Sequence, residues 1–302
     1  MTDLQAPPAV AVRVGRGRAL IRLSRPQQWH KAVMLFAAPS AAGVIDHPSI
    51  VLRAAVAAVA FILLSIAIYA LNDVRDASDD RRHPRKQHRP VAAGAITPPV
   101  ALVWSAFAAA AGLATAAALG VPTLLLGLTY LVAQLAYVQG LKHVAVVDVV
   151  LVALGFVLRA AAGATATGVP VSNWFLLVSL FGALFLVAGK RRAERGSTAP
   201  NARSRPVLAA YSTAWLDQLT TVALLGTTLS YGLWAFQYLG HDVIRQLLAV
   251  SFLPFLTALL RYAFLISTGR GELPEHELFR DRVLIVAGAS WMVLVGAGLY
   301  AA

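Results

Sequence analysis

The succession of long apolar runs is the feature that most constrains this chain. A membrane-spanning helix needs about 20 predominantly apolar residues. Such runs occur at 29–47, 50–71, 98–118, 121–140, 145–166, 172–189, 214–239, 244–267 and 281–301. The last run is short and rich in glycine, so eight spans are the alternative count. The sequence therefore predicts an all-α, polytopic membrane protein of about nine transmembrane helices.

Composition excludes the main soluble classes. Only 13% of the 302 residues are charged and 58% are hydrophobic, with a mean hydropathy of +0.68, whereas soluble domains carry about 25% charged residues. A net charge of +12 would suggest a nucleic-acid partner in a soluble protein. Here the basic residues gather in loops, so we expect no nucleic-acid partner. The absence of cysteine excludes disulfides and thiolate metal sites.

The basic residues alternate between loops in a regular way. The loops after the second, fourth, sixth and eighth runs are basic, whereas those after the first, third, fifth and seventh hold no Lys or Arg. Because cytoplasmic loops carry the excess of Lys and Arg, the N-terminus and the even-numbered loops are predicted to be cytoplasmic, with the chain in the plasma membrane. We expect residues 1–28 to be a basic cytoplasmic segment that leads into a retained first span rather than a signal peptide, and residues 29–302 to form a single transmembrane domain.

An acidic cluster continues directly from the second run. On a helix, Tyr69, Asn72, Asp73, Asp76 and Asp80 fall within an arc of about 100°. The carboxylates of Asp73, Asp76 and Asp80 repel one another, and a hard divalent cation relieves that repulsion. Oxygen ligands of this kind suit Mg²⁺ shared with substrate phosphates. The alternative is a solvated helix end whose acids pair with nearby arginines, namely Arg75, Arg81 and Arg82.

The acids are followed by a cationic stretch from Arg81 to Pro90, which Pro84 and Pro90 keep from being a plain helix. Attraction to anionic lipid explains part of this charge. Acids that hold Mg²⁺ beside bases that hold phosphate are also what a diphosphate site requires. We therefore predict Asn72, Asp73, Asp76 and Asp80 as metal ligands, and Asp73, Asp76 and Asp80 as the catalytic residues.

Three motifs resemble those of the UbiA-type membrane prenyltransferases. These are Asn72-Asp73-x-x-Asp76-x-x-x-Asp80, Arg25-Pro26-x-x-Trp29-x-Lys31 and the Lys-x-x-Arg-Pro-x-x-x-Gly run from Lys86 to Gly94. One departure is Ala32, where relatives usually place Asn. The resemblance covers nearly the whole chain and implies about nine helices around a central cavity, open to the cytoplasm and laterally to lipid.

The loop after the sixth run differs from most of that family. Where a second acidic motif usually stands, the sequence is basic from Lys190 to Arg195 with one Glu. A basic segment here, in addition to the cationic stretch from Arg81 to Pro90, suits the binding of a second phosphate group. Together with the Ala-Gly-Lys-Arg run that closes this span, it makes the chain most similar to the decaprenyl-phosphate phosphoribosyltransferase branch.

That resemblance implies Mg²⁺-dependent transfer of 5-phosphoribosyl from phosphoribosyl diphosphate to a polyprenyl (decaprenyl) phosphate, the first step in supplying decaprenyl-phosphoryl-arabinose for cell-wall arabinan. The acceptor phosphate is already anionic, so no general base is required. The expected substrate-binding residues are two tyrosines and several bases, namely Lys31, Tyr69, Lys86, Tyr137, Lys142, Lys190, Arg191 and Arg159.

Several alternatives stay open at this point. Arg159 lies in the middle of a span, where an Arg is either functional or satisfied by carbonyl and polar groups of the packed helices. The acidic motif also fits prenyl transfer from a polyprenyl diphosphate to an aromatic acceptor, and a transporter with a basic mouth is a third class. An apolar outer belt permits a homo-oligomer.

Overall fold

The computed structural model describes residues 15–84, 86–196, 206–237, 239–240, 242–268 and 280–301. Within these ranges the chain contains helices and no strand. Eight helical segments of this part are long and apolar enough to cross a membrane, which confirms the all-α membrane architecture and comes close to the predicted nine. They are α3 (Pro48–Arg75), α5 (Pro98–Leu119), α6 (Val121–Gln139), α7 (Val147–Thr167), α8 (Asn173–Gly196), α9 (Thr213–Phe236), α10 (Val243–Val250) joined to α11 (Phe252–Ser267), and α13 (Arg282–Tyr300).

The first predicted span, 29–47, is not a regular spanning helix. The chain instead forms a 3₁₀ segment, η1 (Pro26–Val33), followed by the short helix α2 (Met34–Ala41). A 3₁₀ helix rises more steeply per residue than an α-helix, and Pro39 sits inside α2. Hydropathy counts apolar residues and does not register these local departures.

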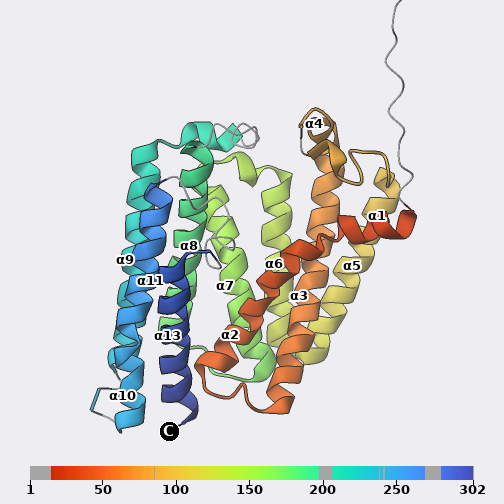
Figure 1. The fold of residues 1–302 in the computed structure, drawn as a ribbon. Coiled ribbons are helices and arrows are strands. Elements are labelled where there is room, and N and C mark those ends of the chain that lie inside the picture. Colours follow the sequence, from red (N-terminus) through yellow and green to blue (C-terminus); the bar gives the residue numbers. More distant parts are fainter. Residues whose placement is uncertain are drawn as a thin grey trace, which may run out of the picture.

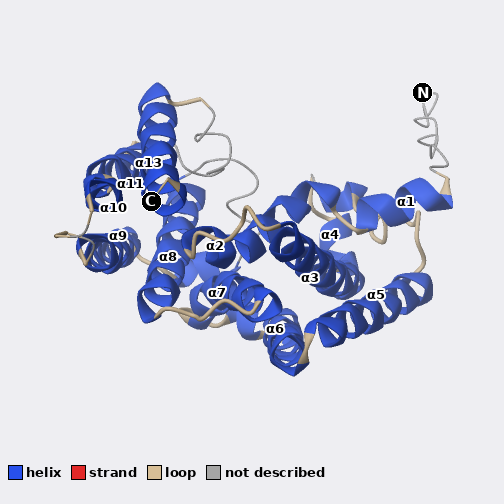
Figure 2. Cartoon of the chain, turned by 90° about the horizontal axis from the view of Figure 1, so that it is seen from below, coloured by secondary structure: helices blue, strands red, loops and turns tan. Residues whose placement is uncertain are grey.

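Helix α2 lies in the interior of the bundle, beside α3 and α7 (Figure 2). Its close approach to α7 depends on Gly163, because a Cβ at this position would stand 2.1 Å from the backbone oxygen of Leu35. The surrounding core contains Phe61 and Leu64 of α3, both fully buried. The preceding segment η1 packs against α3 and α2.

The remaining spans surround this centre (Figure 1). Helices α5 and α6 pack beside α3, while α8, α9, α11 and α13 form the other side of the bundle. Large apolar side chains such as Val103, Val222 and Val293 are exposed on the outside. An outer surface of this kind is stable against lipid and would be unfavourable in water.

The basic segments gather at one end of the molecule. Helix α4 (Ala77–Arg81) and the C-terminal end of α8 lie at the end of the bundle opposite α10 (Figure 1). Helix α1 (Arg16–Leu23) runs crosswise to α3 and α5 at the edge of the bundle (Figure 1). The short segments η2 (Lys86–His88), η3 (Leu141–His143) and η5 (Pro206–Ala210) complete the described elements. Residues 1–14, Arg85 and the stretches 197–205 and 269–279, which belong to the basic loops predicted after the sixth and eighth runs, lie outside the described residues.

Candidate active site

The acidic cluster lies where α3 passes into α4. Helix α3 ends at Arg75, and Asp76 joins the two helices. Helical hydrogen bonding continues across this junction. The backbone N–H of Asp76 donates to the backbone oxygen of Asn72 at 2.9 Å, and the backbone N–H of Asp80 donates to the backbone oxygen of Asp76 at 2.8 Å. Asp79 lies off the predicted arc and is exposed, paired with Arg82 at 2.8 Å.

Two buried carboxylates share a pair of arginines. Asp73 is 1% exposed and accepts a hydrogen bond from Arg25, which stands at the entrance to η1. Arg89 lies 3.5 Å from the same oxygen of Asp73 and 2.7 Å from Asp80. Arg25 adopts the left-handed backbone conformation, at φ 48°. Arg25 and Arg89 thus join three sequence segments around Asp73 and Asp80.

The third carboxylate pairs with a lysine from across the bundle. Lys142, in η3, places its Nζ 2.6 Å from Asp76 and 3.5 Å from the Asn72 side-chain oxygen. Asn72 in turn donates to the second oxygen of Asp76 at 3.0 Å. The structure therefore brings together Lys142 with two of the predicted metal ligands.

The donor set suits a hard divalent cation, because Asn72, Asp73, Asp76 and Asp80 offer oxygen atoms. Among the described residues, however, no three acidic or histidine side chains gather around one point. The side chains of Arg25, Arg89 and Lys142 pair with these carboxylates instead. The predicted alternative of pairing with Arg75, Arg81 or Arg82 holds for Asp79 among these acids. Asp80 pairs instead with Arg89, nine residues on, and Asp73 and Asp76 pair with Arg25 and Lys142, which lie 48 and 66 residues away.

The other predicted binding residues lie at different depths. Tyr69 is half-buried, and the Arg25 guanidinium lies 4.9 Å from the centre of its ring. Lys86 is half-buried in η2. Tyr137 lies on the last turn of α6, before the loop that carries Lys142. Lys190, on α8, is half-buried.

Arg191 lies in a buried ion-pair network. Its guanidinium is 3.2 Å from Asp148 and 3.2 Å from Glu194, and the residue is 2% exposed. Tyr211 donates to the second oxygen of Asp148, and the Val146 N–H donates to the Tyr211 oxygen at 2.6 Å. As placed, this guanidinium is held by protein carboxylates rather than presented to a substrate.

Tyr211 was not predicted, because it lies 63 residues from Asp148 in a segment without a recognisable motif. Burial, and then the hydrogen bond to Asp148, raise the pKa of Tyr211 to about 12. The network also restrains Val146, whose φ of 69° is unfavourable for a β-branched residue. Val146 directly precedes α7 and follows the η3 turn that carries Lys142.

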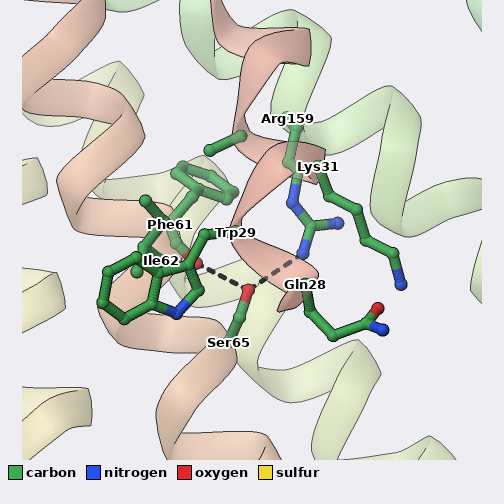
Figure 3. A pocket seen from close by; sticks show the side chains of 8 residues that line it. Gln28, Trp29, Lys31, Phe61, Ile62, Ser65 and Arg159 are labelled. Atoms are coloured by element: carbon green, nitrogen blue, oxygen red, sulfur yellow. Dashed lines mark hydrogen bonds between the residues drawn. The ribbon is translucent and has the colours of Figure 1, made fainter. Parts of the chain in front are cut away.

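Arg159 lies in the interior with neutral partners. Its guanidinium donates to the Gly155 backbone oxygen at 2.8 Å, to Ser65 Oγ at 2.9 Å and to the Tyr130 hydroxyl at 2.8 Å. It also borders a small pocket lined by Lys31 and Ser65 (Figure 3). Both sequence interpretations therefore find a physical basis here, since polar groups satisfy Arg159 while one side of it faces a pocket.

Comparison with known proteins decides the family. The sequence profile of the UbiA prenyltransferase family matches residues 32–280. The chain belongs to this family. The predicted family resemblance is thereby confirmed, and the acidic cluster of α3 and α4 lies within the matched range.

Relatives of this UbiA-family chain share most of its length. A Mycobacterium tuberculosis (strain H37Rv) protein named decaprenyl-phosphate phosphoribosyltransferase is 40% identical over 285 residues, covering 93% of this chain and 94% of the relative. A Corynebacterium glutamicum protein of the same name is 38% identical over 297 residues, covering 93% and 86%. These relatives carry the name of the branch that the sequence motifs predicted for this chain.

Solved structures share the fold at low identity. A UbiA homolog from Archaeoglobus fulgidus, bound to DMAPP and Mg²⁺, superposes with a TM-score of 0.71 at 19% identity, covering 93% of this chain and 97% of that one. A digeranylgeranylglyceryl phosphate synthase superposes with a TM-score of 0.67 at 13% identity, covering 95% and 99%. These likenesses confirm the fold of this UbiA-family chain.

Proposed function

We propose that this chain transfers 5-phosphoribosyl from phosphoribosyl diphosphate to a polyprenyl (decaprenyl) phosphate and releases diphosphate. The observation that carries the proposal is the set of three bases, Arg25, Arg89 and Lys142, that contact the carboxylates of the acidic motif. A reaction between two phosphate-bearing substrates needs carboxylates that hold a metal ion and bases that bind phosphate in one site. The name shared by the mycobacterial and corynebacterial relatives supports the same reaction.

The oxygen atoms of Asn72, Asp73, Asp76 and Asp80 would hold Mg²⁺ once the bases between them are drawn to the substrate, and the bound ion would neutralise charge on the leaving diphosphate. Bases released from the carboxylates then have phosphate oxygens as partners. The guanidinium groups of Arg25 and Arg89 can each donate two parallel hydrogen bonds to a pair of phosphate oxygens. Lys142, Lys190 and Lys86 add point charges at the same end of the bundle.

The transfer itself needs no proton to move. The bond between ribose C1 and the diphosphate oxygen breaks, and its electron pair leaves with the diphosphate. An anionic oxygen of the lipid phosphate supplies the pair for the new bond to C1, from the opposite side, so the configuration at C1 inverts. Positive charge that develops on the ribose is stabilised by nearby carboxylates. Tyr69 and Tyr137 would donate hydrogen bonds to hydroxyl or phosphate oxygens.

The competing prenyl transfer to an aromatic acceptor finds no support at the C-terminal end of α8, where the structure places the run from Lys190 to Arg195 that was predicted as a loop. The described part of that region is basic, and Glu194 is engaged by Arg191. It offers no second cluster of acids for a second metal-bound diphosphate. We further propose that the site opens to the cytoplasm and laterally to lipid, within a single domain from residue 29 to 302.

Purified protein in lipid vesicles, supplied with labelled phosphoribosyl diphosphate, Mg²⁺ and decaprenyl phosphate, tests the proposal. We expect a labelled lipid and an equivalent amount of diphosphate, both lost on chelation of Mg²⁺. A parallel reaction with a labelled polyprenyl diphosphate and 4-hydroxybenzoate tests the prenyl alternative. Label transfer in the second reaction and none in the first would overturn the proposed function.

A further inference from the structure

The turn that carries Lys142 has little buried surface of its own. Its apolar neighbours Leu141, Val144 and Val146 are 38%, 46% and 48% exposed. Apolar side chains that stay at the surface contribute little to holding a segment in place. The Nζ of Lys142 nevertheless lies 2.6 Å from Asp76 of the acidic cluster. The position of this lysine therefore depends on contacts outside the turn.

Val146, which follows this turn, has an unfavourable backbone conformation. Its φ is 69°, in the left-handed region that a β-branched residue rarely adopts. Because its side chain is largely exposed, packing does not explain this conformation. Its backbone N–H donates to the Tyr211 hydroxyl oxygen at 2.6 Å. This hydrogen bond offsets the cost of the conformation and ties the turn to Tyr211.

Tyr211 is itself firmly held. It is 3% exposed, and its ring stacks on that of Trp215 with the centroids 4.7 Å apart. Its hydroxyl donates to one oxygen of the fully buried Asp148, while Arg191 lies 3.2 Å from the other oxygen. With its proton given to Asp148, the hydroxyl oxygen is left to accept from Val146. Tyr211 is therefore a fixed point to which the turn is attached.

This attachment joins the two sides of the bundle. Tyr211 lies between η5 and α9, and η5 contacts η3. Helices α8 and α9 lie on the other side of the bundle from α3, which carries the acidic cluster (Figure 1). Rotation about a backbone bond moves the chain on one side of it relative to the other. A change of φ at Val146 would therefore displace Lys142 from Asp76.

We infer that Tyr211 is a positioning residue, which fixes Lys142 at the acidic cluster through the backbone of Val146. Tyr211 touches no substrate and moves no proton. Lys142, held in this way, is ready to exchange Asp76 for an oxygen of the donor diphosphate. That exchange rests on the proposed function, whereas the positioning of Lys142 rests on the contacts of the turn.

The affinity of the purified full chain for inorganic diphosphate, measured by calorimetry with Mg²⁺ present, tests the inference without turnover. Lys142→Ala should weaken binding about tenfold to a hundredfold, because a charge-assisted contact is lost. Tyr211→Phe should weaken it about threefold to tenfold, because Lys142 is then held less firmly. The matched control is Tyr231→Phe, which loses buried hydrogen bonds with Ser251 and Trp291 near the other end of α9. It should bind diphosphate as the wild type does.

A double-mutant cycle separates positioning from a general loss of structure. If Tyr211 acts through Lys142, Tyr211→Phe should change the affinity by less than about twofold once Lys142 is already replaced by alanine. A tyrosine that only stabilises the fold would lower the affinity equally in both backgrounds. That result would overturn the inference.

The strained backbone of Val146 allows a rescue experiment. Glycine adopts positive φ without strain, so Val146→Gly should restore most of the affinity that Tyr211→Phe loses. Val144→Gly is the matched control and should restore nothing, since Val144 is similarly exposed but has a φ of −95°. If Tyr211→Phe does not fold, Val146→Pro takes its place in the cycle. Proline removes the N–H donor, sets φ at about −65° and is tolerated near the start of a helix.

Three further results would overturn the inference. The wild type could fail to bind diphosphate, Tyr231→Phe could weaken binding as much as Tyr211→Phe does, or Val146→Gly could rescue no better than Val144→Gly. An intact cycle without any phosphoribosyl transfer would instead sink the proposed function alone.

Discussion

At the residue scale, the acids of the motif differ in how open they are. The Asp73 side chain is 1% exposed and that of Asp76 is 29% exposed. Asp73 is closed in by two arginines, whereas Asp76 pairs with a single lysine. Of these two carboxylates, Asp76 is therefore the one that the proposed metal-bound diphosphate would meet with less rearrangement.

This difference predicts the effect of removing one charge. Asp76→Asn should lower phosphoribosyl transfer by at least about a hundredfold, because it removes a proposed ligand of the cation that neutralises the leaving group. Asp79→Asn is the matched control, since Asp79 is exposed and its pair with Arg82 is a surface ion pair of small energy. Initial rates of both variants at saturating Mg²⁺ check the prediction, and equal rates would place the cation elsewhere.

A second residue-scale prediction concerns Tyr211. Tyr211→Phe leaves a buried Asp148 oxygen and the Val146 N–H without their present partner. The free energy of unfolding should fall by about 1–3 kcal/mol, measured by denaturant titration in detergent. An unchanged value would mean that water replaces the hydroxyl fully.

The pH dependence of that difference has a definite sign. The pKa of Tyr211 is raised to about 12 in the fold, from an ordinary value of 10. The neutral hydroxyl is favoured in the folded protein, so its contribution is complete below pH 10 and is lost as pH rises through 12. The gap in unfolding free energy between wild type and Tyr211→Phe should therefore shrink between pH 10 and pH 12. A gap that widens over this interval would contradict the assignment.

At the element scale, apolar runs predict the helices well where membrane-spanning segments are continuous. The boundaries of α5, α6 and α7 lie within a few residues of the predicted runs. The segment from Pro26 to Ala41 is different, because its conformation follows from a 3₁₀ stretch and from packing against α7. Such tertiary contacts leave no periodic trace in one sequence.

The contact between α2 and α7 yields an element-scale prediction. Gly163→Ala would place a methyl group 2.1 Å from the Leu35 backbone oxygen, so α2 has to shift. Overpacking of this kind typically costs about 1–3 kcal/mol. Gly296→Ala is the control, since no atom lies within 4 Å of its added Cβ, and it should be neutral or stabilising. Thermal unfolding of the two variants in detergent should separate them, and equal melting temperatures would show that α2 yields freely.

At the scale of the whole molecule, the sequence places the acids but not their partners. The motif from Asn72 to Asp80 is local, so its spacing predicts one helical face. Arg25 meets Asp73 across 48 residues, and Lys142 meets Asp76 across 66. These pairs depend on how α3 is set against η1 and η3, which spacing along the chain does not encode. Of the three bases that contact these acids, only Lys142 was predicted as a substrate-binding residue; Arg25 and Arg89 stood in motifs without an assigned role, and their pairing with Asp73 and Asp80 emerged from the packing.

The proposed orientation of the molecule rests on the basic charge of its loops and has a direct test. The chain contains no cysteine, so a single introduced thiol reports its own side of the membrane. Gln87, in η2, and Ser172, between α7 and α8, are both exposed. Because basic loops stay in the cytoplasm, Ser172→Cys in intact cells should react with a membrane-impermeant maleimide, and Gln87→Cys should react only after permeabilisation. The reverse pattern would place the acidic cluster outside, away from a cytosolic supply of phosphoribosyl diphosphate, and would overturn the proposed orientation.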